Sequence, residues 1–164
     1  MEIPIGSGGP TAADGVLAIA SDDSWAHVYR SVKEMLEEHD IGTHSDHHGG
    51  MEFFDLTGRR LAPVLSPAWE LRDLVPTGYQ AGACELVQRL HAVVRHAEAY
   101  VRRHPDQVHP AGAAPGVVLA SFPQLLGKSL AEAVELIRLS TTADNTHSAG
   151  WFHNTLHAAG WNHD

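Results

Sequence analysis

Cysteine is almost missing from this sequence, because Cys84 is the only one among 164 residues. A single thiol cannot form an internal disulfide, so the fold has to be stabilised without one. We expect Cys84 to be buried and unreactive, because an activated thiol needs a charged neighbourhood that the local sequence does not display. A redox enzyme built on paired cysteines is thereby excluded.

Long apolar runs are also missing. No stretch approaches the roughly 18 apolar residues that a membrane-spanning helix needs. The first residues, Met-Glu-Ile-Pro-Ile-Gly, lack the basic and apolar regions of a secretory signal peptide. We therefore expect a cytoplasmic protein with no membrane partner.

Basic residues are scarce and unevenly distributed. The chain has 20 acidic and 11 basic residues, a formal net charge of −9. Residues 1–82 hold 13 of the acidic and 5 of the basic groups, whereas residues 83–164 hold 7 and 6. Nucleic-acid affinity depends on Lys and Arg neutralising phosphates, so this balance argues against a nucleic-acid partner. A protein partner with a basic surface suits it better, although the charge also serves solubility.

What is present is the composition of one globular domain, with 43% apolar and 19% charged residues. Residues 1–14 contain Gly-Ser-Gly-Gly-Pro and few apolar side chains, which indicates a flexible leader. Residues 15–164 are predicted to form a single domain.

Periodicity and turn signals predict the elements of this domain. The predicted helices are at 23–39, 83–104, 129–139 and 147–161. A β-hairpin is predicted at 51–65, and short apolar runs at 16–20 and 117–120 fit strands, whereas 69–75 fits a strand or a helix. Pro63 places the second hairpin strand at a sheet edge or ends it early. The order indicates an α+β fold, in which a small, mainly antiparallel sheet is covered by about four helices.

Helix 83–104 is predicted to bury one apolar stripe and to expose its arginines. These are Arg89, Arg95, Arg102 and Arg103. A solvated face is a better interpretation of this set than an anion-binding site.

A histidine-rich loop covers residues 39–50. Its step His39-Asp40 resembles the metal-binding step of HD phosphohydrolases, and residues 43–50 resemble a shortened metallo-β-lactamase loop. The first family needs a further His on an upstream helix, yet His27 lies on the same predicted helix as His39. The second family has two more positions in its loop and an apolar strand before it. Neither resemblance therefore implies an activity for this chain.

The last eighteen residues contain a near-duplication, His-Ser-Ala-Gly-Trp-Phe-His at 147–153 and His-Ala-Ala-Gly-Trp-Asn-His at 157–163. In a helix, His153 and His157 lie one turn apart with Cβ atoms ~5–6 Å from each other, a spacing that suits two imidazoles on one zinc ion. Zinc needs further ligands. We name first His44, Asp46, His47 and His48, with Asp144, His147 and His163 as local alternatives. Half-buried, hydrogen-bonding histidines are the alternative to a metal site.

Catalysis has less support than binding. No glutamate stands between His153 and His157, so the general base of zinc proteases is missing. No other nucleophile or catalytic residue is predicted, and the only cofactor considered is zinc, in a hydrolytic metalloenzyme. Trp151 and Trp161 lie on the side of the predicted terminal helix opposite Phe152, and tryptophans are favoured anchors in protein contacts. The sequence therefore favours a non-enzymatic interaction module, an adaptor, regulator or accessory subunit that docks on a larger protein.

Overall fold

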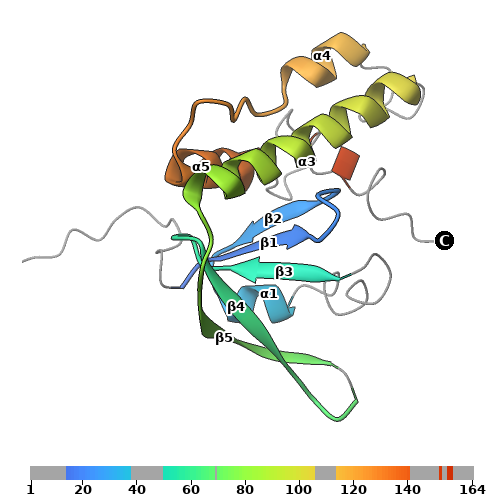
Figure 1. Cartoon of the computed structure of the whole chain (residues 1–164). Coiled ribbons are helices and arrows are strands. Elements are labelled where there is room, and N and C mark those ends of the chain that lie inside the picture. Colours follow the sequence, from blue (N-terminus) through green and yellow to red (C-terminus); the bar gives the residue numbers. More distant parts are fainter. Residues whose placement is uncertain are drawn as a thin grey trace, which may run out of the picture.

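The α+β fold is confirmed. The computed structural model describes residues 14–37, 50–68, 70–105, 114–140, 152, 155 and 156 (Figure 1). In these ranges, five strands form one antiparallel sheet beside four helices. The strands are β1 (Val16–Ala20), β2 (Ala26–Tyr29), β3 (Met51–Phe54), β4 (Arg59–Leu65) and β5 (Leu71–Gln80). The helices are α1 (Val32–Glu37), α3 (Ala83–Arg103), α4 (Pro115–Ala120) and α5 (Leu130–Ser140).

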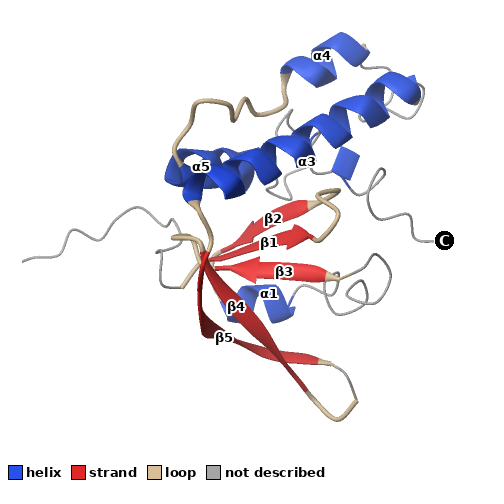
Figure 2. Ribbon diagram, viewed as in Figure 1, coloured by secondary structure: helices blue, strands red, loops and turns tan. Residues whose placement is uncertain are grey.

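The sheet has the strand order β2-β1-β3-β4-β5. Helices α3 and α5 cover one face over β1, β2 and β3, and α1 lies on the opposite face, against β5 and β2 (Figure 2). The inner strand β1 is buried along its whole length and lies between β2 and β3. The main core therefore lies between α3, α5 and the first three strands.

The predicted helix at 23–39 is wrong. Residues 26–29 pair with β1 as β2, and of the described residues 23–37 only the six of α1 are helical. Asp22 Oδ1 accepts hydrogen bonds from the N–H and hydroxyl of Ser24, and Asp23 adopts a left-handed φ of 58°. This turn reverses the chain at the point where the helix was predicted to begin.

The predicted hairpin at 51–65 is confirmed as β3 and β4. In its turn, Asp55 Oδ1 accepts the N–H of Thr57 at 2.8 Å and that of Arg59 at 3.0 Å. Gly58 has a φ of 96°, which favours a residue without a side chain. The turn is therefore formed by the Asp and Gly side-chain and backbone preferences that favour a tight turn in the sequence.

Gly58→Ala is expected to lower the free energy of unfolding by about 1–3 kcal/mol, because a left-handed φ is strained for alanine. The added Cβ would also lie 3.1 Å from Gln80 Nε2 and 3.2 Å from the Ala81 carbonyl oxygen. Urea unfolding measures the loss. Gly78→Ala is the matched control, because its Cβ would meet no atom within 4 Å. Equal stability of the two variants would contradict the prediction.

Two further predictions concern strands. The second hairpin strand does not end early at Pro63, because β4 runs on to Leu65 with β5 beside it; among the described residues the other side of Pro63 has no strand partner, as predicted for an edge position, since β3 pairs with β4 only at Arg60 and Leu61. The run 117–120 is helical, since Pro115 at the first turn of α4 preorganises a helix and short apolar runs do not distinguish the two states. Segment 69–75, left open between strand and helix, becomes the start of β5 from Leu71 onward.

The predicted helices at 83–104 and 129–139 are confirmed as α3 and α5. The helix α5 begins after Ser129, whose Oγ accepts the N–H of Glu132 at 3.2 Å, and the pair Ser129 and Glu132 has the spacing of a capping box. Within the described ranges, no helix is both long and apolar enough to cross a bilayer.

Candidate functional site

All of the residues predicted to bind metal or partner lie outside the described part of the chain, as does the predicted leader up to residue 13. They are His44, Asp46, His47, His48, Asp144, His147, Trp151, His153, His157, Trp161 and His163. Among the residues that the structure describes, no group of three or more His, Cys, Asp or Glu side chains is placed to hold a metal ion. The zinc hypothesis is therefore untested.

Three residues of the predicted terminal helix, at positions 152, 155 and 156, are described, and all three are buried. Phe152 and Leu156 are fully enclosed, and Thr155 is nearly so. The ring of Phe152 meets that of Phe122 edge to face, with centroids 5.1 Å apart. Phe152 and Leu156 were predicted to share one helix face, and both contribute to the core.

An ion-pair cluster lies between α3 and the sheet. Arg89 Nε donates to Asp23 Oδ1 at 2.8 Å, and its Nη2 donates to Glu52 Oε2 at 2.9 Å. The same Nη2 lies 3.3 Å from the Ala20 carbonyl oxygen, and Arg60 approaches the other oxygen of Glu52 at 3.5 Å. Four segments, α3, the β1–β2 turn, β3 and β4, are joined by this cluster.

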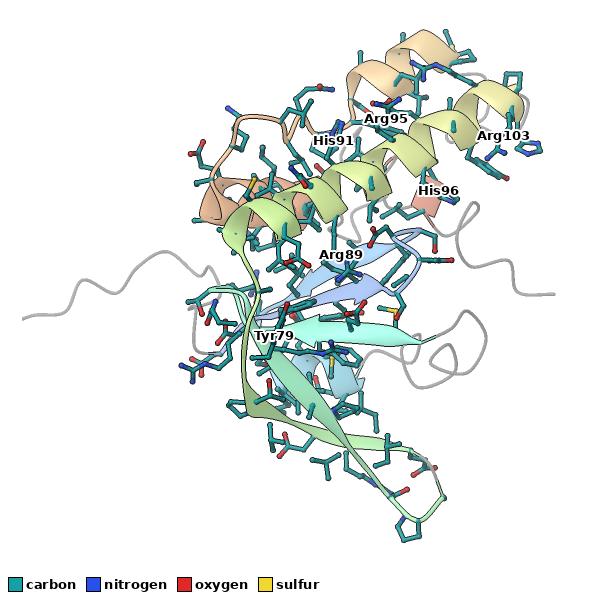
Figure 3. The ribbon with its side chains drawn as sticks, viewed as in Figure 1. Tyr79, Arg89, His91, Arg95, His96 and Arg103 are labelled. Carbon is teal, nitrogen blue, oxygen red and sulfur yellow. The ribbon has the colours of Figure 1, made fainter. Side chains whose placement is uncertain are left out.

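Arg89 corrects the prediction that all four arginines of this helix are solvated, because its side chain is only 17% exposed. Figure 3 shows Arg89 directed from α3 toward the sheet. Burial lowers the pKa of Arg89, but the hydrogen bonds and charges of Asp23 and Glu52 outweigh that effect, so the pKa lies above its usual value. The other three arginines, Arg95, Arg102 and Arg103, are exposed as predicted.

Cys84 also corrects a prediction, because it is exposed and not buried. It lies in the first turn of α3, two residues before Leu86, where the buried stripe begins. Its nearest polar contact is Gln88 Nε2, 3.8 Å from the sulfur.

The candidate interaction surface is on the hairpin of β4 and β5, which extends beyond the end of β3 and away from the helical layer (Figure 1). We call its residues 60–76 the ribbon. Strand β3 pairs with β4 only at Arg60 and Leu61, so the rest of the ribbon has just two strands. Large apolar side chains are exposed on it and at its base. They are Val64, Leu65, Val75 and Tyr79.

Val64 and Val75 share one face of the ribbon. The register pairs Ala62 with Val75 and Val64 with Asp73, and paired residues of an antiparallel ladder point to the same side. Arg60 lies on that side too, two residues before Ala62, and contacts Glu52 in the cluster beneath α3. The face is therefore the continuation of the one that α3 and α5 cover over the first three strands, and we call it the bare face.

Sequence reasoning missed the bare face because segment 69–75 was not assigned. The local pattern does not indicate a strand, because Leu71, Leu74 and Val75 fall at helical spacing with Arg72 and Asp73 between them. The one available signal is the two prolines, Pro63 and Pro76, which indicate that the outer sides of the hairpin lack strand partners.

The chain matches no protein-family model, and comparisons with curated proteins and with solved structures find no significant match.

Proposed function

We propose that this protein is a small acidic interaction module that docks on a larger protein through the bare face of the ribbon. The observation that carries the proposal is the pair Val64 and Val75, which are 40% and 42% exposed on a sheet face that is covered by helices elsewhere. Contiguous exposed apolar groups at the end of an otherwise covered face are typical of interaction sites.

The ribbon is preferred to the other exposed apolar residues because its residues are neighbours on one element. Val64 and Val75 are diagonal partners across two hydrogen-bonded strands, within reach of one another's side chains. Val117, Leu126 and Leu139 are also exposed, but they belong to three separate segments of the helical layer. Scattered apolar residues of that kind are normal on protein surfaces.

The Arg89 cluster has a structural role rather than a binding role in this proposal. Its guanidinium is engaged by two carboxylates, by a backbone carbonyl and by the Phe54 ring 6.0 Å away. Such a cluster orients α3 on the sheet, which in turn determines how much of the sheet face the helix leaves bare.

Photo-cross-linking in the native host tests the docking proposal. A benzophenone amino acid at position 64 or 75 is expected to give one discrete cross-linked species of higher mass. The matched control is the same amino acid in place of Val117, which is 56% exposed and lies on the helical layer. The absence of any species from the ribbon, or the same species at equal yield from position 117, would contradict the proposal.

A further inference from the structure

The outer edge of β5 is closed to an incoming strand. The N–H of Leu74 donates to Asp73 Oδ1 at 2.8 Å, so it points away from β4 and is already satisfied. The register is continuous from 61↔76 to 64↔73, and alternate residues of a strand direct their N–H groups to the same side. Pro76 therefore occupies the next outward position, and it has no N–H. Two successive donors that a new strand would need are unavailable.

The bare face, by contrast, suits a helix. The same sheet face carries α3 and α5 over the first three strands (Figure 2). A helix placed beside them would extend an existing layer, which is how helices and sheets ordinarily pack. Its apolar residues at helical spacing would meet Ala62, Val64 and Val75, the mode in which an amphipathic helix binds an apolar surface.

Charge decides between a partner and a second copy of this chain. Asp73 is exposed directly across the ladder from Val64, and the whole chain carries a formal charge of −9. Two copies meeting through the bare face would bring their like net charges together, which opposes association. A basic partner would gain from both the Asp73 carboxylate and the net charge.

We infer that the occupant of the bare face is an amphipathic helix of a partner protein, with apolar residues over Val64 and Val75 and a basic residue beside Asp73. The inference rests on the proposed docking function and adds the class of partner. Strand addition at β5 is the arrangement that it excludes.

Two synthetic peptides of identical composition test the class of partner. The first is a stapled helix with leucines at helical spacing flanked by lysines, and the second alternates leucine and lysine in the pattern of a strand. Each is titrated into the full-length isotope-labelled protein, with amide chemical shifts as the readout and fluorescence anisotropy for affinity. We expect the helical peptide to bind more tightly and to shift the amides of Val64, Asp73 and Val75.

Three variants make the test specific. Val75→Glu is expected to weaken helix binding by at least about tenfold, because it places a charge in the centre of the contact. Asp73→Asn keeps an oxygen for the Leu74 N–H but removes the charge, so a loss of roughly two- to fivefold is expected, as for an exposed ion pair. Val117→Glu adds the same charge on the helical layer and is expected to leave the affinity unchanged.

Tighter binding of the alternating peptide, with shifts along β5, would overturn the inference, and so would helix binding that Val75→Glu and Val117→Glu weaken equally. Failure to bind either peptide would overturn it as well. Cross-linking from position 75 separates these failures from failure of the docking function. If cross-links form while the helical peptide fails, docking stands and the helix does not; if no cross-links form, docking itself fails.

Discussion

Arg89→Ala is expected to lower the free energy of unfolding by about 2–4 kcal/mol, which is less than the roughly 3–5 kcal/mol for removing one partner of a fully buried ion pair because Asp23 is 30% exposed. The loss has two sources. Asp23 and Glu52 would keep their negative charges but lose the guanidinium that both of them contact. The contact with the Ala20 carbonyl oxygen and the packing over Phe54 would disappear as well.

Arg95→Ala is the matched control for this experiment. It removes the same side chain from the exposed face of the same helix, so a change within about 0.5 kcal/mol is expected. Arg89→Lys should recover only part of the loss, because an ammonium group cannot reproduce a fork that reaches two carboxylates. Chemical unfolding of the three variants measures these differences, and equal stability of Arg89→Ala and Arg95→Ala would show that the cluster is dispensable.

Phe152→Ala is expected to lower the free energy of unfolding by about 3–5 kcal/mol, as for other fully buried aromatic residues. Phe152 has no exposed surface, and its ring packs edge to face on Phe122, in the chain between α4 and α5. Truncation would leave a cavity at the junction of the helical layer and the terminal segment. Such a loss would show that the first copy of the repeat, at 147–153, contributes to the stability of the fold through Phe152.

Leu126→Ala is the control for the aromatic truncation. Leu126 is 67% exposed, so its removal should change stability by no more than about 0.5 kcal/mol. Phe152→Leu should retain most of the stability, because it fills much of the same volume. If Phe152→Ala unfolds at the same urea concentration as Leu126→Ala, the terminal segment does not contribute to the core.

Local signals explain which elements were predictable. The hairpin turn depends on Asp55 and Gly58. Asp55 accepts hydrogen bonds from residues two and four positions further on, and Gly58 takes the positive φ. The start of α5 depends on Ser129 and Glu132, and α3 has a long apolar stripe that ends before Pro105. In each case the signal lies within the segment, as a local hydrogen bond or as the spacing of apolar residues, so it can be recognised in the sequence.

The errors occurred where distant contacts decide. Trp25, Val28 and Val32 repeat at helical spacing, yet pairing with β1 and burial of Val28 and Tyr29 outweigh that preference. Arg89 was interpreted as solvated because its partners, Asp23 and Glu52, lie 66 and 37 residues away. For the candidate site, the two prolines are visible in the sequence, but only the fold shows that α3 and α5 cover the first three strands and leave Val64 and Val75 exposed.

The closed edge of β5 also has a consequence for synthesis of the chain. All five strands precede α3, so the sheet leaves the ribosome before any residue of the helical layer that covers it. Residues 81–156, 76 in number, must follow before Leu156 completes the core, which takes about 4–15 s at ~5–20 residues per second. During that interval the whole sheet face is as bare as the ribbon. The outer edge of β5 offers no free N–H at Leu74 or at Pro76, so it limits strand pairing between nascent chains before α3 and α5 have been synthesised.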